Sequence, residues 1–286
     1  MLDEVHALGY KCQSHLEIAM DPRAACLACL QPPTPRLLEA ALWLAAEHQP
    51  TLQPLDVLQR FNDLLLQVRQ GLPDLPSRQL AQPLLQRLNA LQFQEDDEYP
   101  LRPHSALLNR VLQRRCGQPL SLAIVAMELA QRLGIALHGV SFPGHFLVRA
   151  PGADHLLDPC SGRRLYTREC RDLLQQHMGP NNELQANHLE ACDAHSMLQR
   201  LSRNLRQLHL NAGEPLAALK YAERVLQFGP ATVPDHLARA EIYQRLDCPQ
   251  GERFDLHHAL LLCDDPSQRL QLSQRLRQLE RGPALH

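Results

Sequence analysis

Residues 140–149 read Val-Ser-Phe-Pro-Gly-His-Phe-Leu-Val-Arg, and this stretch decides the fold class. Its Pro-Gly pair separates two short, partly alternating apolar runs, which is the pattern of strands joined by a turn. A third run follows at residues 155–158, after the break Pro-Gly-Ala-Asp. We therefore predict that residues 135–141, 145–150 and 155–158 form three adjacent antiparallel strands.

The segment before these runs has a helical pattern. Residues 114–122 read Arg-Arg-Cys-Gly-Gln-Pro-Leu-Ser-Leu, and Pro119 suits the first turn of a helix. The pattern that follows is apolar on nearly every side and stops at Gly134. Because a helix without a polar face has to be buried, this segment is predicted to be the central helix of the domain.

Three residues of this region have the side chains of a catalytic triad. Ser121, His145 and Asp158 would serve as nucleophile, general base and the group that orients the base. A helix dipole contributes about 0.3–2 kcal/mol, too little to ionise an alcohol at neutral pH, so Ser121 would need His145 in contact. We predict Ser121 Oγ near one ring nitrogen of His145 and Asp158 near the other. The alternatives are a Ser121 that only bonds a backbone N–H at the helix start and a structural His145.

The blocks at residues 114–122, 139–149 and 157–159 resemble the SirB family. This is a bacterial branch of the transglutaminase-like, papain-related superfamily, and its members typically carry tetratricopeptide repeats after the first domain. The resemblance covers about residues 35–280. It implies an α+β class, with a transglutaminase-like core, N-terminal helices and a C-terminal all-α tetratricopeptide-like tail.

The resemblance also bears on function. Active members of the superfamily use a Cys-His-Asp triad, and residue matching puts Ser121 at the cysteine position, His145 at the histidine and Asp158 at the aspartate. Serine is the weaker nucleophile. The expected function is therefore that of a protein-binding or scaffold protein with a regulatory role, built on a catalytically altered domain. The alternative is an amide or ester hydrolase or acyl transferase that uses these three residues.

The chain divides into three parts by pattern. Residues 1–33 are weakly patterned. Residues 34–186 form the transglutaminase-like domain, with a helical lead-in at 34–115 and the core at 116–166. Residues 187–286 form the repeat tail.

A 34-residue spacing marks the tail, because Leu205, His209 and Gly213 are followed by Ala240, Tyr243 and Asp247 at or near that distance. Two degenerate repeats bury too little surface to stand alone, so we expect them to dock on the first domain. We expect the concave face of the repeats to bind an acidic or extended peptide. The alternative is that the arginine and histidine side chains of this face are ordinary solvated residues. The candidates to line that face are Arg203, Arg206, His209 and Arg239.

Composition limits the partners and the compartment. The net charge of −2 gives no reason to expect nucleic acid, and no apolar run approaches the roughly 20 residues that span a membrane. The beginning of the sequence lacks a signal-peptide pattern, so the nine cysteines are interpreted as reduced thiols in the cytoplasm. The expected partner is another protein or peptide, bound by the repeat groove or the altered pocket.

No cofactor or metal is expected. Cys26 and Cys29 form a lone Cys-x-x-Cys pair, to which Cys12 and His15 could add two zinc ligands, although packed cysteines are the simpler interpretation. His138, His145 and His155 lack a metal-binding spacing. Cys116 and Cys160 are the candidates for a substitute nucleophile, and each is more simply a structural thiol.

Overall fold

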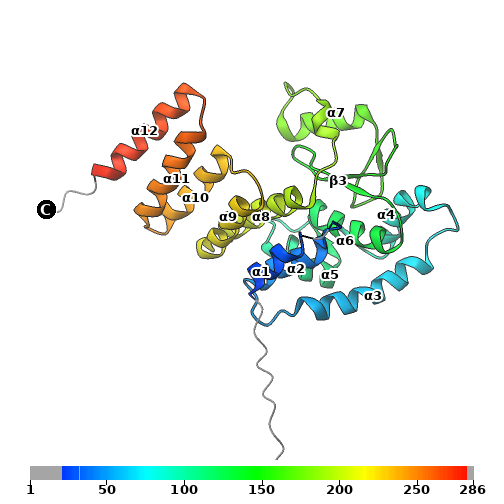
Figure 1. The fold of residues 1–286 in the computed structure, drawn as a ribbon. Helices are drawn as coiled ribbons and strands as arrows, with labels where there is room; N and C mark the ends of the chain where they lie inside the picture. The colour runs from blue at the N-terminus through cyan, green and yellow to red at the C-terminus, as the bar shows by residue number, and fades with distance from the viewer. Residues whose placement is uncertain (1–20, 32, 282–286) are drawn as a thin grey trace, which may run out of the picture.

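A computed structural model describes residues 21–31 and 33–281 of the 286-residue chain (Figure 1). A mixed α/β part occupies one side of the molecule, and a row of helices extends from it (Figure 1). The helices before the sheet are α1 (Pro22–Ala28), α2 (Leu37–Ala46), α3 (Pro54–Gln70), η1 (Ser77–Gln79), α4 (Ala81–Ala90), η2 (Pro103–Ser105), α5 (Leu108–Arg114) and α6 (Pro119–Arg132). After the sheet come α7 (Thr167–Met178), η3 (Ala186–Leu189), α8 (Ala194–Asn211), α9 (Pro215–Phe228), α10 (Val233–Arg245), α11 (Pro249–Leu262) and α12 (Pro266–Arg281).

The main sheet has four antiparallel strands in the order β3-β4-β5-β6. They are β3 (His138–Val140), β4 (Leu147–Arg149), β5 (Leu156–Leu157) and β6 (Arg164–Leu165). The first three lie within the predicted runs, and their antiparallel pairing is confirmed. The sequence pattern missed β6, because two residues are too few to show alternation. A separate parallel pair joins β1 (Gln94–Glu95) to β2 (Cys116–Gly117).

Helix α6 is the central helix of the α/β part, as predicted. Pro119 stands at its first turn, and nine of its residues are buried on all sides of the helix. After its last turn Gly134 adopts a φ of 69°, and the Ile135 N–H donates to the Ala130 carbonyl at 2.8 Å. This closing turn requires the left-handed conformation that glycine adopts without strain. It directs the chain from α6 into β3.

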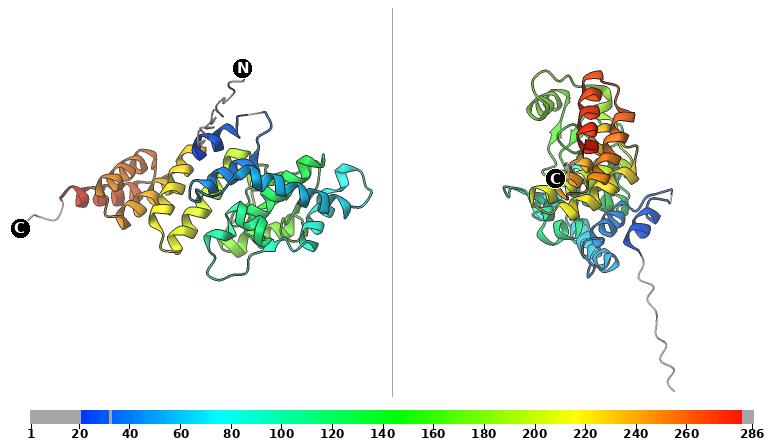
Figure 2. Two further views of the ribbon diagram at one scale, coloured as in Figure 1. Left: turned by 90° about the horizontal axis from the view of Figure 1, so that it is seen from below. Right: turned by 90° about the vertical axis from the view of Figure 1, so that its left-hand side faces the viewer.

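Helices α8 and α9 belong to the core of the α/β part. Met197, Leu201 and Leu205 of α8 and Tyr221 of α9 lie in one continuous apolar cluster with residues of α2 and α6. The expected docking of the tail is therefore confirmed for these two helices. Helices α10, α11 and α12 lie farther out, in Figure 1 and in the left view of Figure 2, around a small apolar cluster of their own.

The four cationic candidates for an open repeat face are instead paired inside the tail. Arg203 makes two hydrogen bonds to Asp235, at 2.8 and 2.7 Å, and Arg239 makes two to Asp255, at 2.7 and 2.9 Å. The prediction that they line an open groove is wrong, because neighbouring helices use them to neutralise buried carboxylates. Likewise, His209 contacts Glu214 at 2.6 Å, and the buried Arg206 lies 3.7 Å from Asp235.

Among residues 21–31 and 33–281, no helix combines the length and the apolar character needed to cross a bilayer.

A buried ion pair ties α9 to α2. Arg224 donates to both carboxylate oxygens of Glu47 at 2.7 Å, and the two side chains are only 5% and 9% exposed. Breaking such a pair leaves a buried charge without its partner, whereas replacing both members by apolar residues is often neutral.

We predict that Arg224→Met lowers the free energy of unfolding by about 3–5 kcal/mol, because Glu47 stays buried and unpaired. The double variant Glu47→Leu/Arg224→Met should regain most of this loss. The control is Arg245→Met, which breaks the exposed pair with Glu241 and should cost at most about 1 kcal/mol. Urea unfolding of the full chain measures all three, and equal losses for the two single variants would contradict the prediction.

Candidate functional site

The turn between β3 and β4 carries His145. The Phe142 N–H donates to the Val140 carbonyl, and the His145 N–H donates to the Phe142 carbonyl. Gly144 has a φ of 73°, and a Cβ at this position would collide with the His177 side chain. Glycine is thus required both by the backbone conformation and by the close approach of α7.

His145 and Asp158 lie side by side. Nε2 of His145 is 3.8 Å from Oδ1 of Asp158, a charge contact longer than a hydrogen bond. The two side chains are 15% and 19% exposed. On its other side the His145 ring stacks on that of His177, with ring centroids 5.9 Å apart. The expected proximity of histidine and aspartate therefore arises from neighbouring strands.

Asp158 is held in its charged form. Burial alone would raise the pKa of its carboxyl, but contacts with His145, Ser161 and the Cys160 N–H together hold that pKa below its usual value. The Ser161 hydroxyl donates to it at 2.6 Å and the Cys160 N–H at 3.1 Å. Asp158 thus both orients His145 and closes the turn after β5.

Ser121 has a different environment. It lies in the first turn of α6 and is fully buried, and its hydroxyl donates to the Ala106 carbonyl at 3.1 Å. Ser121 is thus bonded to the backbone, but to a carbonyl fifteen residues away and not to a backbone N–H at the helix start, as the alternative interpretation expected. The structure brings His145 and Asp158 together, but it directs the hydrogen bond of Ser121 to Ala106 and not to His145.

A cavity of about 270 Å³ opens beside His145. The start of α6 contributes Gln118, Pro119 and Leu120 to its wall, and the rest comes from Glu95, Asp96, Leu101, Gly144, His145, Phe146, His177, Arg200 and Asn204. Among these described residues, none has a hydroxyl or thiol side chain. The cavity wall therefore includes a base, His145, without a hydroxyl or thiol beside it.

Arg200 of α8 fixes the turn that carries His145. Its guanidinium donates to Ser141 Oγ and the Phe142 carbonyl at 2.8 Å and to the His145 carbonyl at 2.7 Å. It also lies over the Phe146 ring, 5.5 Å from the centroid. Burial lowers the pKa of this arginine, and within the described part of the chain no carboxylate forms a salt bridge with it. Three aligned acceptors and one aromatic face replace the missing counter-charge.

One turn further along α8, the Asn204 side chain donates to Gln118 Oε1 at 2.9 Å. The first tail helix thus supports both walls of the cavity. Sequence reasoning missed Arg200, Asn204 and His177. A signal was present for the first two, since a polar pair spaced by four residues interrupts the apolar pattern of an amphipathic helix.

The cysteines are packing residues where the structure describes them. Cys26 and Cys29 are both buried, and burial raises the pKa of Cys26 to about 12 and that of Cys29 to about 11. Cys160 is buried, and burial followed by the charge of Asp158 raises its thiol pKa. Cys116 is half-buried and is not part of the cavity wall. Cys12 and His15 lie outside the described residues.

The histidines of the sheet region do not converge. His138 is exposed on β3, and His155 contacts Asp154 at 2.8 Å. In the described ranges, one group of acidic and histidine side chains has ligand atoms within 4.8 Å of one another, and it consists of Asp96, Glu98 and His104. Arg114 already occupies Asp96 at 2.6 Å and stands 3.7 Å from Glu98. An arginine at this place competes directly with a cation.

Because the folded pKa of Asp158 lies below the unfolded value, its contribution to stability is full above about pH 4 and is lost as pH falls through the folded pKa. We predict that Asp158→Asn costs about 1.5–3 kcal/mol at pH 7, the range of hydrogen bonds to a charged group. The difference from the wild type should shrink between pH 4 and 2. Unfolding curves across this range test the prediction, with Asp172→Asn, at an exposed carboxylate of α7, as the control. A difference that stays constant with pH would contradict it.

Comparison with known proteins agrees with this architecture. Residues 55–203 match the Transglutaminase-like superfamily and residues 205–277 match a tetratricopeptide repeat family. A UPF0162 protein of Pseudomonas aeruginosa is 59% identical over 261 residues, which cover 91% of this chain and 97% of that protein. A UPF0162 protein of Xylella fastidiosa is 39% identical over 172 residues (58% of this chain, 61% of the relative).

Protein SirB1 of Salmonella typhimurium is 28% identical over 163 residues, 56% of this chain and 61% of that protein. Among solved structures, the crystal structure of menin aligns over 93% of this chain and 78% of that chain, with a TM-score of 0.42 and 11% identity. This last likeness is too weak to carry an inference. The sequence matches are strong enough to assign the family. The chain belongs to the SirB family of the transglutaminase-like superfamily, with tetratricopeptide repeats after the transglutaminase-like domain.

Proposed function

We propose that this chain is a protein-binding scaffold in which the altered transglutaminase-like site recognises a peptide segment of a partner. The observation that carries the proposal is the composition of the cavity wall beside His145. Its described residues include the base, His145, but no hydroxyl or thiol, and Asp158 contacts His145 from outside this wall. Acyl transfer by covalent catalysis needs a nucleophile in contact with the base.

Ser121 is poorly placed to supply that nucleophile. Its hydroxyl would have to leave the Ala106 carbonyl, and a buried carbonyl without its donor costs about 1–3 kcal/mol. The side chain would also have to enter a cavity whose wall includes Pro119 and Leu120 but not Ser121 itself. Both requirements favour recognition over catalysis.

The volume of the cavity indicates the size of the group that it can bind. Ligand sites for drug-sized molecules usually measure about 300–1,000 Å³, so 270 Å³ suits one or two amino-acid side chains. The wall offers the imidazoles of His145 and His177 on one side and the carboxylate of the exposed Glu95 on another. A polar side chain presented by a partner's loop would find both donors and an acceptor there.

The repeats supply the second part of the proposed function. Tetratricopeptide arrays are solenoids that present an extended binding surface. Here α8 contacts the cavity through Arg200 and Asn204, while α10–α12 extend away from it. A partner bound along the array would thus have one end close to the His145 cavity. A cytoplasmic, regulatory role belongs to the same proposal.

The alternative is a hydrolase or acyl transferase that uses Ser121, His145 and Asp158. The retained contact between His145 and Asp158 favours it, because an oriented imidazole is the costly part of such a site. It requires a state in which the Ser121 hydroxyl faces His145.

The scaffold and hydrolase hypotheses differ in whether a serine-directed fluorophosphonate modifies Ser121. We predict no labelling of Ser121 in the full chain, measured by intact mass and by peptide mapping, with a serine hydrolase as the positive control. Stoichiometric labelling that His145→Ala abolishes would establish the hydrolase and overturn the scaffold reading.

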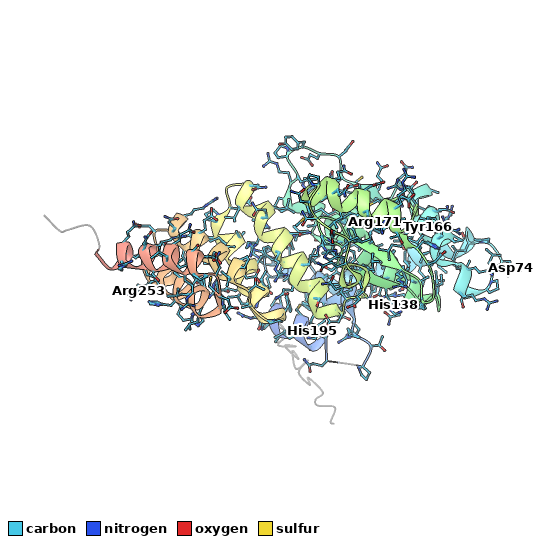
Figure 3. The ribbon with its side chains drawn as sticks, turned by 90° about the horizontal axis from the view of Figure 1, so that it is seen from above. Asp74, His138, Tyr166, Arg171, His195 and Arg253 are labelled. Carbon is cyan, nitrogen blue, oxygen red and sulfur yellow. The ribbon has the colours of Figure 1, made fainter. Side chains whose placement is uncertain are left out.

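A photo-crosslinking residue tests binding directly. Placed at His177, on the cavity wall, benzoylphenylalanine should capture a discrete partner in the native cell. The matched control is the same residue at Arg171, which is exposed on the same helix (Figure 3). Identical adducts from both positions would show that capture does not depend on the cavity.

A further inference from the structure

A second hollow lies farther along α6, toward its C-terminal end and away from the His145 cavity. This groove encloses about 460 Å³ and shares no lining residue with that cavity. Its floor is α6, with Ile124, Met127, Glu128 and Gln131, and its sides are residues 33–37, 135–138 and 192–197. Most of these side chains are apolar, and a methionine stands on each side, Met127 and Met197.

One side of the groove is a strand edge. β3 is the outermost strand of its sheet, and His138 and Val140 pair with Arg149 and Leu147 of β4. The N–H and C=O of Gly139, which lies between these two residues, point away from β4, and the Gly139 carbonyl accepts from the Cys192 N–H at 2.9 Å. Residues 190–192 thus cover the far end of the edge, where Val140 also bridges to Ala191.

The near end of that edge is open. Leu137 immediately precedes β3, and continuing the alternation of the strand turns its N–H and C=O to the same side as those of Gly139. Within the described part of the chain, neither the N–H nor the carbonyl of Leu137 has a hydrogen-bond partner. The chain that covers Gly139 turns away at Asp193, the N-cap of α8, before it reaches Leu137. The Leu137 side chain is itself buried, and its residue is only 7% exposed.

These two features specify the kind of occupant. An unpaired N–H and C=O on a strand edge are satisfied by the backbone of another extended chain. An apolar groove beside that edge accepts alternate side chains of the added strand. A helix could fill the groove but would leave Leu137 unpaired, because a helix uses its own peptide groups internally.

The charge of the groove limits which extended segments can bind there. The ionisable side chains of the groove are Glu128, His138 and Asp193. Asp193 accepts from the Ser196 N–H at 2.7 Å, and this backbone contact, followed by the Ser196 side chain, holds its pKa below the usual value. The rim therefore carries fixed negative charge, although Glu128 is partly neutralised by Arg132 at 2.7 Å. An acidic segment would be repelled.

We propose that the groove beside Leu137 is a docking site for an extended, apolar, non-acidic segment of another protein. The segment adds as a short strand outside β3, pairs with Leu137, and places one side chain between Met127 and Met197. His138 and His195, which lie on the same side of the molecule in Figure 3, flank this entrance from β3 and from the first turn of α8. This site is separate from the peptide cavity of the proposed function, so either can fail without the other.

The test selects decapeptides from a random phage-displayed library on the immobilised full chain. Selected peptides are then synthesised with fluorescein and titrated by anisotropy. We expect apolar residues at every second position and no acidic residues between them. Methylation of the peptide nitrogen that pairs with Leu137 should weaken binding at least tenfold, because it removes one strand hydrogen bond.

Two groove variants and one control complete the design. Met127→Glu and Ala136→Glu should each weaken binding at least tenfold, because each puts a charge into the apolar groove. Ala136 is exposed, so its variant keeps the test valid even if Met127→Glu fails to fold. The control Met178→Glu makes the same change at a 51% exposed methionine on α7 and should leave the affinity unchanged.

Three results would overturn the proposal. The library could yield no peptide, the selected peptides could bind both groove variants as well as the wild type, or N-methylation could have no effect. Light scattering addresses a second copy of this chain as the occupant. A dimer that Ala136→Glu dissociates would replace the proposed partner by the chain itself.

Discussion

The arrangement of the whole molecule depends on α8, and within it on one arginine. The side chain of Arg200 projects from α8 and donates to three oxygens of the turn that carries His145. Burying a guanidinium raises the free energy of the folded state unless its N–H groups are hydrogen-bonded. The contact therefore depends on both the conformation of the turn and the position of α8. The same helix contributes Met197, Leu201 and Leu205 to the main core. The first repeat helix is therefore a structural part of the α/β domain.

Under the proposed scaffold function, this dependence accounts for a histidine–aspartate pair that is kept without a nucleophile in contact. His145 is positioned by Gly144, Arg200 and Asp158, and none of these contacts involves Ser121. Asp158 in turn closes the turn after β5 through Ser161 and Cys160. Each residue of the histidine–aspartate pair thus has a structural role that is independent of bond cleavage. Retention of the pair is what stability alone would require.

The parts of this structure that local pattern determines could be predicted. The Pro-Gly break at residues 143–144 predicted the turn between β3 and β4, and the all-round apolar run after Pro119 predicted the buried α6. Consecutive antiparallel strands brought His145 and Asp158 together for the same reason. The direction of the Ser121 side chain depends on packing against Ala106, fifteen residues away, and the role of Arg200 on a turn 55 residues earlier. Spacing along a helix cannot report such distant partners, and it likewise assigned Arg203 and Arg239 to an open face when Asp235 and Asp255 bind them.

The outer repeats have an apolar cluster of their own, formed by Ala240, Leu256, Ala259, Cys263, Leu272 and Leu276. None of these six belongs to the core that α8 and α9 share with the α/β domain. In a solenoid each unit contacts only its neighbours, so its stability adds to the rest nearly independently. Helix pairs added at the outer end would therefore extend the reach of the molecule without disturbing the domain that carries His145. Loss of α10 would not be neutral, because its Asp235 pairs with Arg203 of α8.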